Sequence, residues 1–83
     1  MELSPIVTSI SNVSECGEHF KIAVSFFGPG EMTLEIKKHD GLKIQEGDGI
    51  SCFVSLEGNA LKLNENIELF RDGMLYASAK LDL

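Results

Sequence analysis

Short turn sequences divide this chain into segments of similar length, and this spacing restricts the fold more than any other feature. The turns are expected at Cys16-Gly17-Glu18, Gly28-Pro29-Gly30, Asp40-Gly41, Gly47-Asp48-Gly49, Glu57-Gly58-Asn59 and Asp72-Gly73. The segments between them are about 7–12 residues long, which is typical of all-β barrels and sandwiches. Most segments alternate apolar and polar residues, as half-buried strands do, and none keeps a helical period. The sequence therefore predicts an all-β fold.

We expect strands at residues 6–13, 19–27, 31–38, 50–56, 60–63, 67–70 and 74–83. The apolar phase predicts the inward positions: Phe20, Ile22, Val24 and Phe26; Met32, Leu34 and Ile36; Ile50, Cys52, Val54 and Leu56; and Leu75, Ala77, Ala79, Leu81 and Leu83. The first segment is apolar in both phases, so the sequence does not decide which of its two faces points inward. Residues 31–38 also fit a short helix, although their length favours a strand. Asp72-Gly73 predicts a hairpin with a primed turn.

A chain of 83 residues has room for one domain, here a small barrel over residues 1–83. Such a domain buries only ~60–65% of the surface that its unfolded chain exposes, so its core is thin. Dimerisation enlarges a thin core, and we expect a homodimer. The net charge of −6 argues against a polybasic protein whose affinity rests on paired phosphates.

The polar phase of the strands combines aromatic rings with lysines. This outward set is Phe27, Phe53, Tyr76, Lys21, Lys37, Lys62 and Lys80. Rings that stack on bases, beside lysines that follow the phosphates, are a common way to hold single-stranded nucleic acid. The same rings also fit beneath a neighbouring loop or against a dimer mate. The set predicts sequence-tolerant binding of single strands, with DNA favoured over RNA.

No residue pattern points to catalysis or to a bound cofactor. Gly28-Pro29-Gly30 is not a phosphate-binding loop, because the proline removes an N–H that an anion would use. Cys16, His19, His39 and Cys52 lack the two close pairs of a structural zinc site. We therefore expect no enzyme activity, no metal and no cofactor. Cys16 and Cys52 are expected to be free thiols, with Cys52 filling the core.

Nothing in the sequence predicts a membrane segment or a secretion signal. No apolar run approaches the ~20 residues of a membrane span, and the first residues show no signal pattern. We expect no membrane partner and a cytoplasmic location, which is the host cytoplasm if the source is viral.

Two stretches resemble an OB-fold. The first is an opening hairpin over residues 6–10 and 19–24, and the second runs from 44–50 into the hairpin 54–63. In OB-fold domains that bind nucleic acid, a similar Gly-Asp pair enters the fourth strand. The length is also similar to that of small phage proteins that bind single-stranded DNA as dimers. The resemblance implies an antiparallel barrel of five to seven strands that binds single strands.

A second resemblance begins at Leu42. Gly47-Asp48, Asn64, Phe70 and Gly73-Met74-Leu75 are similar to the C-terminal domains of type III secretion and flagellar switch proteins. That similarity implies an intertwined β dimer that binds other proteins. The alternative function is therefore protein–protein interaction, as an assembly adaptor or as a small acidic inhibitor that offers carboxylates to a basic partner.

Overall fold

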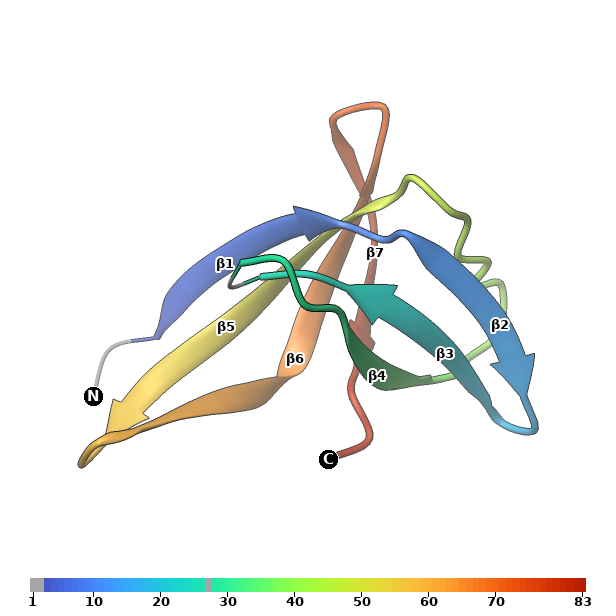
Figure 1. Ribbon diagram of the computed structural model, residues 1–83. Helices are drawn as coiled ribbons and strands as arrows, with labels where there is room; N and C mark the ends of the chain where they lie inside the picture. The colour runs from blue at the N-terminus through green and yellow to red at the C-terminus, as the bar shows by residue number, and fades with distance from the viewer. Residues whose placement is uncertain (1–2, 27) are drawn as a thin grey trace.

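The computed structural model describes residues 3–26 and 28–83, and these residues form seven antiparallel strands and no helix (Figure 1). The strands are β1 (Ser4–Ser9), β2 (Asn12–Cys16), β3 (His19–Val24), β4 (Met32–Lys37), β5 (Gly49–Glu57), β6 (Ala60–Arg71) and β7 (Met74–Lys80). One sheet has the order β1-β5-β6-β7 and the other has the order β2-β3-β4. The predicted all-β fold is confirmed, and the alternative helix at 31–38 is a strand.

The first predicted strand is two strands, because the chain bends at Ile10 and passes from one sheet to the other. Ile10 is buried in the core, and its amide donates to the Asp48 carbonyl at 2.8 Å. The next amide, that of Ser11, donates to the Ala23 carbonyl of the second sheet at 2.9 Å. The backbone therefore exchanges partners within two residues, which makes β1 and β2 members of different sheets.

On the other side of the molecule, a short contact joins the end of β7 to β4. Leu81 forms an isolated antiparallel bridge with Ile36, and the Asp82 amide donates to the Glu35 carbonyl at 2.9 Å. This single bridge does not make a continuous sheet, and the described residues form two sheets without a closed barrel.

The core lies between the facing sides of the two sheets. Its members are buried apolar side chains: Ile10, Phe20, Ile22, Val24, Leu34, Ile36, Leu42, Ile44, Ile50, Cys52, Ile67, Leu69, Ala79 and Leu81. The predicted inward phase is confirmed at the centre of β3, β4, β5 and β7. In the first segment, where the sequence did not decide the inward face, Ile10 points inward and Val7 is exposed.

Four residues predicted to lie inward are instead exposed: Met32, Leu56, Leu75 and Leu83. The reason for Leu56 is the unequal length of the strands. β5 has nine residues and β6 has twelve, whereas β3 and β4 have six each. The hairpin that joins β5 to β6 therefore extends past the opposite sheet, at the lower left of Figure 1. Its inner face has no sheet to pack against.

Residues 60–71 form one continuous strand, where two separate strands were predicted. Cys52 of β5 faces Ile67, but Val54 faces Leu63, so three residues of β6 oppose Phe53 alone. Asn64 organises this bulge, since its side-chain oxygen accepts the Asn66 amide at 2.9 Å. Residues 64–66, which separate the two predicted strands, therefore form a bulge within one strand.

A second irregularity shapes the hairpin of β6 and β7. Leu69 faces Ala77 while Phe70 faces Leu75, so Tyr76 is an extra residue in β7. The turn of this hairpin has positive φ at Asp72 (53°) and Gly73 (77°), which confirms the primed turn. The bulge changes the phase of the hairpin beyond it, and Leu75 is consequently exposed.

The two cysteines differ enough in environment to be tested directly. Cys16 is exposed, and Cys52 is buried where desolvation raises its thiol pKa to about 11. We expect a disulfide reagent such as DTNB to titrate one thiol in the native protein and two after denaturation, because the thiolate is the reactive form. The Cys16→Ser variant should lose the fast reaction entirely. Two fast thiols in the native protein would contradict the buried position of Cys52.

Candidate functional site

The fold distributes the predicted aromatic and lysine residues over several places. Phe27 lies outside the described residues. Lys21 and Lys37 are on the outer face of the β2-β3-β4 sheet, whereas Phe53, Lys62 and Lys80 are on the outer face of the other sheet. Because the two sheets pack through their inner faces, their outer faces point in opposite directions. The structure therefore brings Phe53, Lys62 and Lys80 to one side, without the other two lysines.

Carboxylates accompany several of these lysines. Lys62 lies 3.7 Å from Glu57, and Lys80 lies 3.8 Å from Glu65. Lys21 is directly opposite Glu35 in the strand register. Exposed ion pairs contribute little to stability, but each cancels a positive charge locally. The outer face that holds Phe53 is therefore close to neutral around its two lysines.

Tyr76 occupies a different environment from the one predicted. Its hydroxyl donates to the buried carboxylate of Asp48 at 2.5 Å. The guanidinium of Arg71 binds the same carboxylate through Nε at 2.9 Å and Nη2 at 2.8 Å, and it stacks 4.3 Å from the Tyr76 ring centre. The Gln45 amide adds a fourth bond at 3.0 Å. Asp48 is only 3% exposed, so this network replaces its hydration almost completely.

These contacts set the protonation states of the network. Burial by itself raises the pKa of Asp48, but the hydrogen bonds from Arg71, Tyr76 and the Gln45 amide outweigh it and lower the pKa below its usual value. Burial and the neighbouring carboxylate raise the pKa of Tyr76 to about 12. The network therefore combines an ionised Asp48, a charged Arg71 and a neutral Tyr76 around neutral pH, and every oxygen of the carboxylate has a donor. This arrangement suits a structural role, and we call Asp48, Arg71 and Tyr76 the clamp.

Sequence reasoning missed this cluster because it joins positions that are far apart in the chain. Asp48 and Arg71 are 23 residues apart, and Asp48 and Tyr76 are 28 apart. One signal was present: Arg71 is the single arginine of the sequence and follows a predicted strand. An arginine at that position binds a carboxylate in the bidentate manner that lysine does not offer.

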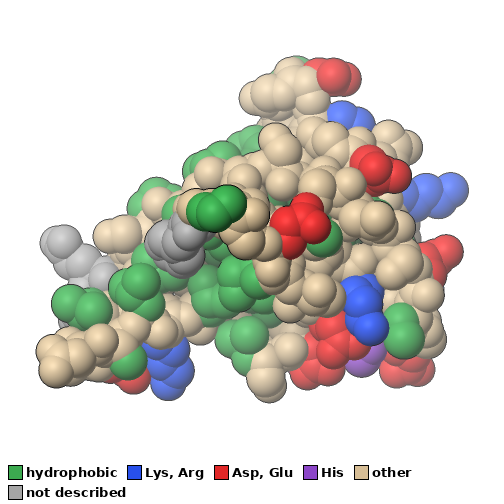
Figure 2. All heavy atoms as spheres, viewed as in Figure 1, with side chains coloured by type: hydrophobic (Ala, Val, Ile, Leu, Met, Phe, Trp, Pro, Cys, Tyr) green, Lys and Arg blue, Asp and Glu red, His purple; other side chains and the backbone are tan. Residues whose placement is uncertain are grey.

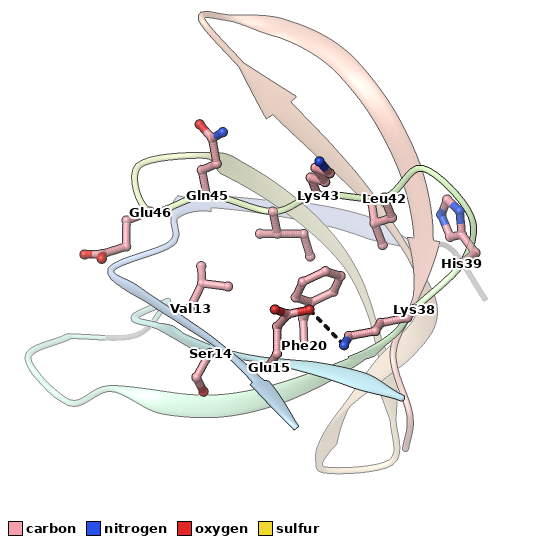
Figure 3. Close-up of a pocket in the computed structure, with 11 residues that line it drawn as sticks. Val13, Ser14, Glu15, Phe20, Lys38, His39, Leu42, Lys43, Gln45 and Glu46 are labelled. Carbon is pink, nitrogen blue, oxygen red and sulfur yellow. Dashed lines mark ion pairs between the residues drawn. The ribbon is translucent and has the colours of Figure 1, made fainter. Parts of the chain in front are cut away.

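The clamp holds one wall of a groove, which is shown in Figure 3. The groove has a volume of about 670 Å³ and lies between β2 and the segment 42–46. Arg71 Nη2 donates to the Lys43 carbonyl at 2.9 Å, which ties this segment to the clamp. Its apolar surface comes from Val13, which is half-buried, and from the buried side chains of Phe20, Leu42 and Ile44.

Charged groups form the rim of the same groove. Lys38 Nζ lies 2.8 Å from the Glu15 carboxylate, and the same nitrogen lies 5.3 Å from the centre of the Phe20 ring. The hydrogen bond from Lys38 lowers the pKa of Glu15 below its usual value. His39 also lines the groove, with Nε2 3.1 Å from the Ser78 carbonyl. The groove therefore combines an apolar interior with a rim of both charges.

A second cavity of about 460 Å³ opens beside the β5–β6 hairpin. It is lined by Phe26, Met32, Val54, Leu61, Lys62, Leu63 and Leu83. Val54, Leu56, Leu61 and Leu63 form two cross-strand pairs on the inner face of the hairpin, and we call these four residues the hairpin face. In Figure 2, hydrophobic side chains gather over this half of the molecule, and most charged side chains lie over the other half.

Within residues 3–26 and 28–83, no three His, Cys, Asp or Glu side chains are grouped to hold a metal. His19 instead pairs with Asp82 at 2.8 Å, while Cys52 is in the core. The described part of the chain also contains no helix with the length and apolarity needed to cross a bilayer.

Comparison of the chain with protein-family models, curated proteins and solved structures finds no match.

The clamp can be tested by removing the charge of Asp48. We expect Asp48→Asn to destabilise the domain by about 1–3 kcal/mol, because it removes the buried charge that accepts hydrogen bonds from the Gln45 amide, Arg71 and Tyr76. The control is Glu46→Gln, an exposed carboxylate in the same segment. Urea denaturation measures both variants, and equal stabilities would contradict the clamp.

The single tyrosine reports on the same network through its absorbance at 295 nm. Tyr76 should ionise near pH 12 in the native protein and at lower pH in Asp48→Asn. Since folding raises this pKa, its stabilising effect is complete below about pH 10, the ordinary tyrosine value, and disappears as the pH rises through 12. An unshifted tyrosine titration in the native protein would show that the Asp48 contact is absent.

Proposed function

We propose that this domain is a non-catalytic module that binds another protein. The observation that carries the proposal is the hairpin face. Leu56 is 56% exposed and Leu61 is 60% exposed, although both lie on the inner side of a sheet whose centre forms the core. Contiguous apolar surface beside a cavity is a feature of protein interaction sites, because burial of such surface drives association.

The chemistry of the face indicates the kind of partner. The cross-strand pairs Val54–Leu63 and Leu56–Leu61 carry no charge, and the nearby Lys62 is paired with Glu57. A partner with an apolar strip fits this surface. The net charge of −6 favours a partner that is basic around that strip, since opposite charges accelerate encounter. An assembly adaptor and an acidic inhibitor would each bind a partner of this kind.

The test compares two exposed apolar residues at different places. Leu61→Ser changes the hairpin face, and Met74→Ser is the matched control, since Met74 is 72% exposed on the β6–β7 hairpin. We expect quantitative affinity capture from the native cells to lose specific proteins with Leu61→Ser by at least tenfold and to retain them with Met74→Ser. Equal recovery by both variants would contradict the proposal.

Sedimentation velocity of the same variants identifies the case in which the partner is a second copy. A homodimer through the hairpin face should dissociate in Leu61→Ser and persist in Met74→Ser. A dimer that persists in both variants would place the dimer contact elsewhere.

Binding of single-stranded nucleic acid is the second candidate, and one arrangement favours it. Phe53, Lys62 and Lys80 share the outer face of the β1-β5-β6-β7 sheet, as an aromatic platform beside two lysines requires. The bend from β1 to β2 and the Leu81–Ile36 bridge also support an OB-like closure of the two sheets into a barrel. Because Glu57 and Glu65 partly neutralise these two lysines, we favour protein binding over this candidate.

Fluorescence anisotropy with labelled oligothymidine tests the second candidate at low and moderate salt. Loss of a stacking ring costs about 1–3 kcal/mol, so Phe53→Ala should weaken binding by about tenfold or more. Lys80→Ala should also weaken it, whereas Lys21→Ala on the opposite sheet serves as the matched control. Absence of binding at low salt, or an equal effect of both lysine variants, would exclude this face as the site.

A further inference from the structure

The groove of Figure 3 runs along the free edge of a strand. Val13, Ser14 and Glu15 are consecutive residues of β2, and all three line it. Side chains of a strand alternate between the two faces of the sheet, so three neighbours line one cavity only where the strand presents its edge. β2 pairs with β3 on one side and is the terminal strand of its sheet on the other.

The register identifies which backbone groups face the groove. A two-residue turn joins β2 to β3, with φ 60° at Gly17, so Cys16 and His19 form the first hydrogen-bonded pair. Hydrogen-bonded and non-hydrogen-bonded pairs alternate in an antiparallel ladder, so Val13 and Glu15 direct their N–H and C=O groups away from β3. Within the described residues, neither backbone bonds to the segment 42–46 across the groove.

We propose that this groove binds an extended segment of a partner protein, which adds to the edge of β2 as a further strand. The proposal rests on the proposed function as a protein-binding module and names a second site and the form of its partner. An extended backbone is the ligand that offers donors and acceptors in alternation along one line, as the edges of Val13 and Glu15 require. Its inward side chains meet Phe20, Leu42 and Ile44, which favours apolar residues at alternate positions.

The rim specifies the outward side chains of the bound segment. Lys43 and Glu46 line the groove and are exposed, and neither has an ion pair within the described part of the chain. They suit a segment with one acidic and one basic side chain between its apolar positions. The Glu15–Lys38 pair lies over the opening, and charged groups at an edge discourage indiscriminate strand pairing. The site therefore selects a patterned segment over any exposed strand.

The test needs a variant that removes one edge donor and a variant that removes only the side chain. Glu15→Pro lacks the amide N–H and the carboxylate, whereas Glu15→Ala lacks the carboxylate alone. Linear seven-residue peptides selected from a displayed random library against the unaltered protein serve as probes. We expect the best peptide to bind Glu15→Ala within about threefold of the unaltered protein and to bind Glu15→Pro at least tenfold more weakly.

Amide hydrogen exchange provides a measurement that does not depend on the proline variant folding. Peptide binding should slow exchange at Val13 and Glu15, because their amides gain an acceptor. It should leave exchange along the hairpin face unchanged. Equal affinity for both Glu15 variants, unchanged exchange at Val13 and Glu15, or failure of the library to yield any binder would overturn the proposal.

One further variant separates this inference from the proposed function. Leu61→Ser removes part of the hairpin face and should leave peptide affinity at the β2 groove unchanged. If protein capture is unaffected by Leu61→Ser while peptide binding still requires the Glu15 amide, the hairpin face is not the partner site and the groove is. Loss of peptide affinity in Leu61→Ser would place the peptide on the hairpin face and contradict the groove.

Discussion

The carboxylate of Asp48 ties the loop before β5 to the paired ends of β6 and β7, at the place where these strands lie side by side in one sheet. Its side chain receives the Gln45 amide, the Arg71 guanidinium and the Tyr76 hydroxyl. Its carbonyl receives the amide of Ile10 at the bend between the two sheets. A buried carboxylate is costly unless it is fully bonded, so the loop before β5, the end of β6 and the bulge of β7 must be placed together.

The position of the segment 42–46 follows from this interaction. Arg71 reaches past Asp48 to the Lys43 carbonyl, while Leu42 and Ile44 insert into the core. The segment stays close to β2 without pairing with it, and the space between them is the groove. The segment 42–46 is held in place beside the open edge of β2, so the groove is formed before a partner binds. A preformed site lowers the entropic cost of binding an extended chain.

The hairpin face arises from a different constraint, the unequal length of the two sheets. Apolar pairs continue along β5 and β6 for two positions after the opposite sheet has ended. The exposed leucines there use the same phase as the buried core residues Ile50 and Cys52. The domain thus presents two different surfaces. The hairpin face offers apolar side chains, whereas the edge of β2 offers unpaired backbone groups beside charged side chains.

Much of the secondary structure follows from local pattern. Ile22, Ile36 and Ile50 lie where the alternation of apolar residues predicts, because a strand sends alternate side chains to one face whatever its partners are. The turn at Asp72-Gly73 is equally local, since it depends on the φ angles that its own residues accept. The free, buried Cys52 also follows from its place in the apolar phase of β5.

Other features depend on pairings between distant residues. Tyr76 shares the polar phase of β7, yet a bulge and the carboxylate of Asp48 direct it into the clamp. Leu56 shares the phase of the core but is exposed, since burial needs an opposite sheet and β3 ends first. Phe53 and Lys21 share the polar phase and lie on different sheets. The alternation of apolar and polar residues in the sequence shows which side chains share a face of one strand. Which faces meet depends on strand order, strand length and register, and contacts across the whole fold set these three.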